Sequence, residues 1–161
     1  MPIYTKTGDR GKTVSFDQKP TSKNSLKINA IGTIDELNSN VGVVSSLVSV
    51  DTLQRYLQLV QRDLFQIGSY LSGKEDEVLK ESRVTFLEDQ IDDWDKQLPT
   101  LTNFILPGGT QTAALTHQAR SVCRRAEREL VAYHERKGVD PVILQYVNRL
   151  SDWLFMLARY I

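Results

Sequence analysis

The sequence of 161 residues predicts an all-α protein, a five-helix up-and-down bundle with an irregular N-terminal arm. Apolar side chains recur at the spacing of an amphipathic helix in five separate segments. The connections between these segments are mostly short, which favours packing of neighbouring helices into a bundle. No convincing strand pattern follows the arm. We expect a single domain over residues 1–161, with the arm at 1–30 and the helical bundle at 31–161.

The arm contains a polar loop, Thr5-Lys-Thr-Gly-Asp-Arg-Gly-Lys-Thr13. Its backbone N–H groups and hydroxyls can turn toward an oxyanion, although the same composition also suits an ordinary turn. A Walker A motif requires glycine where Lys6 stands, and a helix where Val14-Ser-Phe-Asp17 follows. We therefore exclude a P-loop and leave open both a phosphate cradle of another kind and a plain turn.

The first helix is predicted to begin at Thr33. Thr33 and Glu36 have the spacing of a capping box, and Ile34 and Leu37 begin an apolar stripe. Asp35 then falls in the first turn, where a carboxylate interacts favourably with the helix dipole. A purely structural role for Asp35 is therefore one alternative.

The next two helices follow from apolar periodicity and from their end signals. The second is expected from Asp51, as its cap, to near Gly73, and the third from Arg83 to Leu98, ended by Pro99. Apolar residues at helical spacing support both helices: Leu53, Leu57, Val60, Leu64, Ile67 and Leu71 in the second, and Val84, Leu87, Ile91 and Trp94 in the third.

An irregular segment, Asn103-Phe-Ile-Leu-Pro-Gly-Gly-Thr110, separates the third helix from the fourth. Three consecutive apolar residues, beginning with Phe104, stand before two glycines that free the backbone. The segment is either a buried plug or an exposed apolar wall for a large flat ligand.

The fourth helix is basic and ends near Gly138. Arg120, Arg124 and Arg128 recur at i, i+4 and i+8, so they form one stripe beside a single acid, Glu127. Arginine forks match phosphate and carboxylate oxygens, so the stripe is either an anion site or a solvated face. An apolar arc packs the other side of the helix: Leu115, Ala119, Val122, Cys123, Ala126, Leu130 and Tyr133.

The last helix is expected from Asp140, as N-cap, through Pro141 at its first position to about Tyr160. A polar stripe on this helix includes Asn148 and Asp152. In helical bundles, sites form where polar stripes of facing helices meet.

Composition limits the classes of function. Lys plus Arg and Asp plus Glu both number 20, so zero net charge gives no attraction to nucleic acid or to an anionic membrane. No apolar run is long enough for a membrane span, and no targeting segment is visible, so we expect a cytoplasmic protein. The single Cys123 is expected to be a small buried residue, and His117 and His134 structural or surface residues. No zinc-type cluster or nucleophile–His–acid set occurs.

Five motifs together resemble the PduO-type ATP:cob(I)alamin adenosyltransferase family. In chain order they are Thr5-Lys-Thr-Gly-Asp-Arg-Gly-Lys-Thr13, Gly32-Thr-Ile-Asp-Glu-Leu-Asn-Ser39, Phe104-Ile-Leu-Pro-Gly-Gly109, Arg120-Ser-Val-Cys-Arg-Arg-Ala-Glu-Arg128 and Tyr146-Val-Asn-Arg-Leu-Ser-Asp152. The resemblance implies a homotrimer with active sites between subunits. It also implies that cob(I)alamin attacks the 5′ carbon of ATP, with Mg²⁺ on the nucleotide, giving adenosylcobalamin and tripolyphosphate.

The resemblance also implies roles for individual residues. ATP binding is assigned to Thr5, Lys6, Thr7, Gly8, Thr13, Val14, Lys23, Arg124, Arg125, Ala126, Glu127, Arg128 and Asn148. Asp35 and Arg120 match a salt bridge across the subunit interface, and Phe104 matches the aromatic that closes the lower face of the corrin. These three and Arg124 are the expected catalytic residues. Charged residues of the last helix match structural supports of the site: Arg149 and Asp152.

Three positions depart from the family pattern. Lys27 stands where the family usually has arginine, Asn29 where it often has an acid, and Ile31 where an aromatic is frequent.

Two alternatives to the enzyme are a catalytically silent bundle that carries or senses ATP or cobalamin, and a structural interaction module. The metal ligands, and docking of a reductase or a cobalamin-dependent enzyme, are left open.

Overall fold

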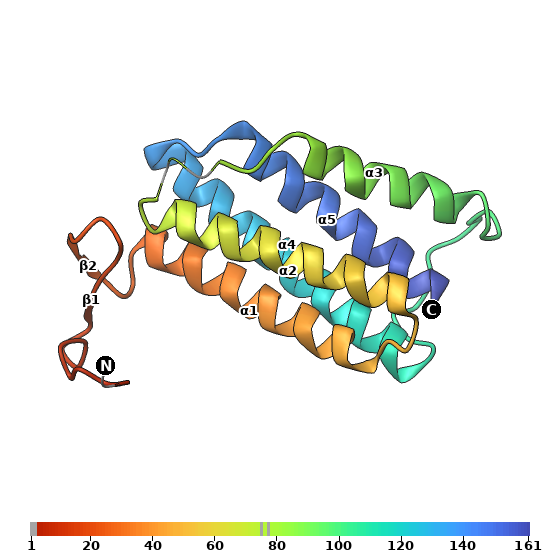
Figure 1. Ribbon diagram of the computed structural model, residues 1–161, viewed down its shortest axis with the longest axis horizontal. Helices are drawn as coiled ribbons and strands as arrows, with labels where there is room; N and C mark the ends of the chain where they lie inside the picture. Colours follow the sequence, from red (N-terminus) through yellow and green to blue (C-terminus); the bar gives the residue numbers. More distant parts are fainter. Residues whose placement is uncertain (1–2, 75, 77) are drawn as a thin grey trace.

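The computed structural model describes residues 3–74, 76 and 78–161, and it confirms the predicted all-α five-helix bundle (Figure 1). The helices are α1 (Leu26–Leu47), α2 (Asp51–Leu71), α3 (Ser82–Asp95), α4 (Gln111–Lys137) and α5 (Pro141–Tyr160). Helix α1 packs against both α2 and α4, α4 packs against α5, and α5 packs against α3. None of the helices in the described ranges is long and apolar enough to cross a membrane.

The arm projects from one end of the bundle, beside the start of α1 (Figure 1). It contains a small antiparallel hairpin of β1 (Lys12–Val14) and β2 (Pro20–Ser22), in which Thr13 is opposite Thr21. This hairpin is the sheet of the described chain. A pair of three-residue strands buries little apolar surface, so the arm depends on other contacts for its position.

The predicted start of the first helix is wrong. Helix α1 begins at Leu26, and the side chain of Ser25 caps it by accepting a hydrogen bond from the backbone N–H of Ile28 at 3.3 Å. Thr33 lies inside the helix, where its hydroxyl donates to the carbonyls of Asn29 and Ala30 instead of capping. A threonine can bond backward within a helix as readily as it caps one. Two further turns of helix thus precede the apolar stripe.

Other helix ends were predicted with mixed success. Asp140 caps α5 by accepting from the N–H of Val142 at 2.9 Å, and Pro141 takes the first position, as expected. Asp51 does not cap α2, because it is the first residue of the helix and Val50 precedes it without a side-chain bond. Helix α3 ends at Asp95, three residues before the expected end.

All five helices contribute to the core, and its largest fully buried side chains include Trp153 and Tyr146. Cys123 is fully buried as expected, and its thiol donates to the carbonyl of Val147 at 3.4 Å. Burial raises the pKa of the Cys123 thiol well above its ordinary value, so the sulfur stays protonated and unreactive.

A buried carboxylate connects three helices. Asp63 of α2 is 6% exposed and accepts from Arg83 of α3 through two nitrogens, the shortest contact being 2.8 Å. The hydroxyl of Tyr146, on α5, donates to the same carboxylate at 2.8 Å. Burial raises the pKa of Tyr146 well above its usual value, so its proton remains available for this bond. Charge-assisted bonds of this kind fix geometry as well as adding stability.

We predict that Asp63→Ala lowers the free energy of unfolding by about 3–5 kcal/mol, because the change leaves the Arg83 guanidinium without its buried partner. Urea denaturation at fixed protein concentration measures the loss. Asp93→Ala is the matched control, since Asp93 pairs with Lys96 on the exposed face of α3. Equal stability of the two variants would show that the buried network does not hold the bundle together.

Candidate active site

Six of the residues predicted to bind ATP converge in the arm. They lie around a cavity of about 410 Å³ whose lining residues are Thr5, Thr7, Gly8, Lys12, Thr13, Val14, Pro20 and Lys23. The hydroxyls of Thr5 and Thr7 are 2.8 Å apart. A side chain at Gly8 would stand 3.1 Å from the ammonium of Lys23, so glycine permits this close approach.

The loop around this cavity is built from successive tight turns. The N–H of Asp9 donates to the carbonyl of Lys6, that of Gly11 to Gly8, and that of Lys23 to Gly11. Lys6 has a left-handed backbone, with φ of 59°, and its side chain is exposed. The sequence left a plain turn and a phosphate cradle as alternatives. The same loop forms tight turns and also lines a cavity, so the two alternatives do not exclude each other. Hydroxyl, ammonium and backbone N–H groups gathered in this way suit a polyphosphate.

The second group of predicted ATP-binding residues lies on α4. Arg124 and Arg128 are exposed, and with Glu127 and Val131 they line a separate cavity of about 280 Å³. The guanidinium of Arg128 donates to the carbonyl of Arg124 at 3.2 Å. Asn148 of α5 donates to the carboxylate of Glu127 at 2.8 Å, so the contact between these two predicted site residues is present. The two guanidinium groups face solvent and can bind an anion by donating hydrogen bonds to it.

The two other residues of this segment have structural contacts in the chain. Arg125 forms an ion pair with Glu36 of α1. Ala126 is fully buried in the core, so its side chain cannot touch a ligand from within this chain. The cavity of the arm and the cavity of α4 share no lining residue. A single chain therefore presents the predicted nucleotide site as two separate halves.

Asp35 and Arg120, predicted to pair across a subunit interface, are not paired with each other within the described part of this chain. Asp35 is exposed and lines a cavity of about 670 Å³ between α1, α2 and the arm. It is not in the first turn of α1, so the dipole role does not apply. Arg120 is half-buried, and its Nε is buried without a hydrogen-bond partner. A buried guanidinium N–H without a partner is costly and indicates a missing acceptor.

Phe104 lies in an exposed segment, so the alternative of a buried plug is wrong. Its side chain is fully exposed, as is most of Leu106. Four residues before this segment, Arg159 of α5 donates to the carbonyl of Pro99 at 2.6 Å and fastens the chain there. At the end of the segment, Thr110 caps α4 by accepting from the N–H of Ala113. The result is an apolar surface that projects from the bundle between two fixed points.

The charged residues predicted to support the site lie between α5 and α3. Arg149 donates to Glu88 at 3.0 Å and to Asp152 at 3.2 Å.

Both histidines have structural positions. His117 is 5% exposed beside Phe155, and burial lowers its pKa, whereas Nδ1 of His134 accepts from the backbone after the end of α4.

Sequence reasoning missed several residues of the arm. Lys12 and Pro20 line its cavity, but the register of so short a hairpin has no apolar pattern from which to read it. Asp17, at the hairpin turn, pairs with Lys27 at 2.7 Å. Lys27 departs from the family pattern, but nothing in the local pattern of the sequence pointed to this contact.

A family model described as cobalamin adenosyltransferase matches residues 3–161. The corrinoid adenosyltransferase of Bacillus subtilis (strain 168) is 41% identical over 168 residues, which cover 100% of this chain and 86% of the relative. That of Homo sapiens is 40% identical over 169 residues, 98% of this chain and 68% of the relative.

Solved structures agree with these relatives. A variant of a PduO-type ATP:corrinoid adenosyltransferase from Lactobacillus reuteri, complexed with cobalamin and ATP, superposes with a TM-score of 0.94 at 37% identity. The match covers 99% of this chain and 92% of that chain. Sequence and fold thus agree, and the chain belongs to the cobalamin adenosyltransferase family.

Proposed function

We propose that this protein transfers the 5′-deoxyadenosyl group of ATP to cob(I)alamin, giving adenosylcobalamin and tripolyphosphate. The family match over almost the whole chain supports the reaction. The observation in the structure that supports it most directly is the gathering of threonine, glycine and lysine groups in the arm, together with the exposed arginines of α4. Both sets suit a triphosphate.

The chemistry requires no nucleophilic side chain. The reduced cobalt of cob(I)alamin attacks the 5′ carbon of ATP, the C–O bond breaks, and its electron pair leaves with tripolyphosphate. Arg124, Arg128 and Lys23 stabilise the charge that grows on this leaving group. Holding the two substrates in line can contribute about 7–11 kcal/mol through proximity alone. The protein therefore acts mainly by positioning and by electrostatics.

The active site lies between subunits of a homotrimer, in this proposal. The arm of one subunit supplies the cradle, and α4 of a neighbour supplies the arginines. The separate cavities support this arrangement, since each holds half of the predicted nucleotide contacts. Arg120 and Asp35 support it independently. The Nε of Arg120 has no hydrogen-bond acceptor, and the exposed carboxylate of Asp35 on a neighbouring subunit could serve as one.

Magnesium enters this proposal with the nucleotide and not as a resident ion. Among the described residues, no group of three or more His, Cys, Asp or Glu side chains is placed to hold a metal. Mg²⁺ commonly binds through substrate phosphates with few protein ligands, which fits such a site. The hydroxyls of Thr5 and Thr7 belong to residues that line the arm cavity, in which the triphosphate is proposed to bind.

Cytoplasmic location and docking of a reductase or a cobalamin-dependent enzyme remain predictions. The decisive test of function is anaerobic: purified protein, ATP, Mg²⁺ and chemically reduced cob(I)alamin, followed by corrin absorbance and by tripolyphosphate. One tripolyphosphate per adenosylcobalamin supports the enzyme. Tight ATP binding without turnover would instead identify a silent carrier or sensor.

We predict that Arg124→Ala and Arg128→Ala each weaken ATP binding about tenfold or more, because each removes a charge-assisted contact with the triphosphate. Isothermal titration of ATP measures the affinity. Arg136→Ala is the control, since Arg136 is an exposed arginine of the same helix beyond the α4 cavity. Unchanged affinity in both site variants would remove α4 from the nucleotide site.

Phe104→Ala is expected to bind both substrates but to lose most turnover that starts from Co(II). An apolar side chain on the lower face of the corrin excludes water, which favours four-coordinate Co(II) and eases its reduction. Coupled reduction and adenosylation assays measure the loss, and Leu106→Ala is the matched control in the same segment. A normal rate for Phe104→Ala would exclude it from the mechanism.

Asp35→Asn is expected to weaken the oligomer, since a buried pair that loses one partner is destabilised by about 3–5 kcal/mol. Sedimentation velocity over a range of protein concentrations measures the assembly. The charge-reversed double variant, Asp35→Arg with Arg120→Asp, should restore part of it. An Asp35→Asn protein that is trimeric, equally stable and fully active would contradict the intersubunit pair.

A further inference from the structure

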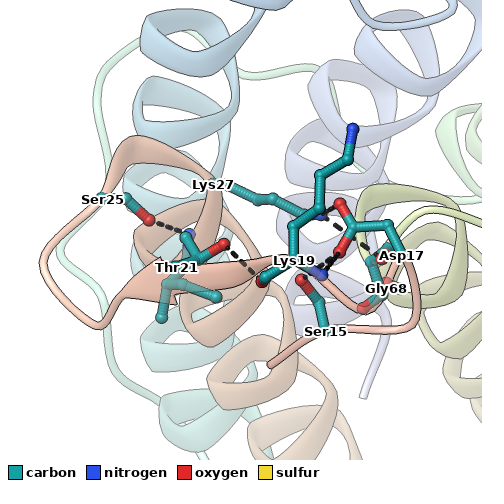
Figure 2. Close-up of polar contacts among 9 residues, drawn as sticks. Ser15, Asp17, Lys19, Thr21, Ser25, Lys27 and Gly68 are labelled. Atoms are coloured by element: carbon teal, nitrogen blue, oxygen red, sulfur yellow. Dashed lines mark hydrogen bonds and ion pairs between the residues drawn. The ribbon is translucent and has the colours of Figure 1, made fainter. Parts of the chain in front are cut away.

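A group of contacts, which we call the Asp17 latch, fastens the turn of the arm hairpin to the bundle. It consists of the Asp17 carboxylate, the Lys27 ammonium of α1 and the backbone carbonyl of Ser72, just after α2. Lys27 donates to Asp17 at 2.7 Å and to the Ser72 carbonyl at 3.4 Å, and the N–H of Asp17 donates to the same carbonyl at 3.3 Å. Figure 2 shows Lys27 reaching across to this carboxylate.

The turn itself also organises the Asp17 carboxylate. The hydroxyl of Ser15 donates to Asp17 Oδ1 at 3.1 Å, and the N–H of Lys19 donates to the same oxygen at 3.2 Å. The Lys27 ammonium, aided by the Lys19 N–H, lowers the pKa of Asp17 to about 2. The carboxylate is therefore ionised at neutral pH, where it attracts the Lys27 ammonium.

Close packing of the backbone supports the same contact. Gly73 has a φ of 113°, and a Cβ built on it would lie 2.9 Å from the Cβ of Asp17. Glycine is thus required where the chain leaves α2 and meets the hairpin turn. The side chains of Lys27 and Asp17 are only 14% and 27% exposed, so solvent screens the pair less than it would an exposed one.

The helix gains nothing from a lysine at this place. Lys27 is in the first turn of α1, where the positive end of the helix dipole disfavours a cation. Among the described residues, the carboxylate that pairs with its ammonium is that of Asp17, which belongs to the arm. The two strands that leave the Asp17 turn lead directly to Thr13 and, through β2, to Lys23, both at the cavity of the arm.

We infer that Asp17 and Lys27 are positioning residues, which hold the hairpin in place so that the arm cavity is formed before ATP arrives. The inference rests on the proposed function, in which that cavity binds the triphosphate. An arm that is already ordered loses less conformational entropy when the ligand binds. The latch should therefore act on ATP affinity and not on the chemical step.

The test compares Lys27→Gln, Asp17→Asn and their double variant with the unaltered protein. Hydrogen exchange of residues 12–22, measured without nucleotide, is expected to become faster in all three. In the anaerobic assay, KM for ATP should rise about fivefold with kcat little changed, as loss of one partly buried charged contact implies. The double variant should be no worse than either single one, because the two residues act through one contact.

Two controls separate positioning from general stability. Lys27→Arg keeps the positive charge and should show the hydrogen exchange and the KM of the unaltered protein. Lys96→Gln removes an exposed ion pair far from the arm and should change neither quantity. Unchanged exchange in Lys27→Gln and Asp17→Asn would overturn the latch, and faster exchange with an unchanged KM would overturn its role in positioning. Hydrogen exchange needs no substrate, so failure of the latch and failure of the proposed reaction give different results.

Discussion

The buried Asp63 carboxylate is the constraint on which the arrangement of the helices depends. Helix α3 packs on α5 and α2 packs on α1, while α4 lies against both α1 and α5. Asp63 adds a polar connection between α2, α3 and α5 by binding Arg83 and Tyr146 at once. Because the carboxylate has its partners only when all three helices are correctly placed, this network selects one packing. Helix α4 packs against α1 and α5 through its buried apolar residues, which leaves Arg124 and Arg128 exposed.

Large side chains of the described residues pack the interior of the bundle, and most of the predicted site residues are found near its surface. Trp153 and Tyr146 fill the centre, so the groups predicted to act on substrates lie on the outer surface. Phe104 projects into solvent from one segment, while Arg124 and Lys23 belong to different cavities. Exposed groups cannot exclude water or surround a corrin by themselves. In the proposed trimer, a neighbouring subunit covers these groups.

The bundle was predictable because periodic apolar residues and strong end signals, such as Asp140-Pro141, agree with each other. The start of α1 was not, because Thr33 can satisfy its hydroxyl inside a helix, and the true cap, Ser25, precedes a weakly amphipathic stretch. Among the site residues, motif matching proposed the members of the arm cavity. Periodicity alone placed Arg124 and Arg128 on one stripe but left its purpose open.

Contacts in the arm could not be read from local pattern, because they join residues whose charges have no helical or strand spacing. Lys27 differs from the arginine usual in the family, yet its ammonium reaches Asp17 and the Ser72 carbonyl together. A lysine ammonium carries three rotatable donors, so it can bond to both acceptors at once. The hairpin has little apolar surface of its own, so these few polar contacts determine where the cradle stands. The position of the arm cavity relative to the bundle therefore depends on the ion pair of Asp17 and Lys27, which forms only when the chain is folded.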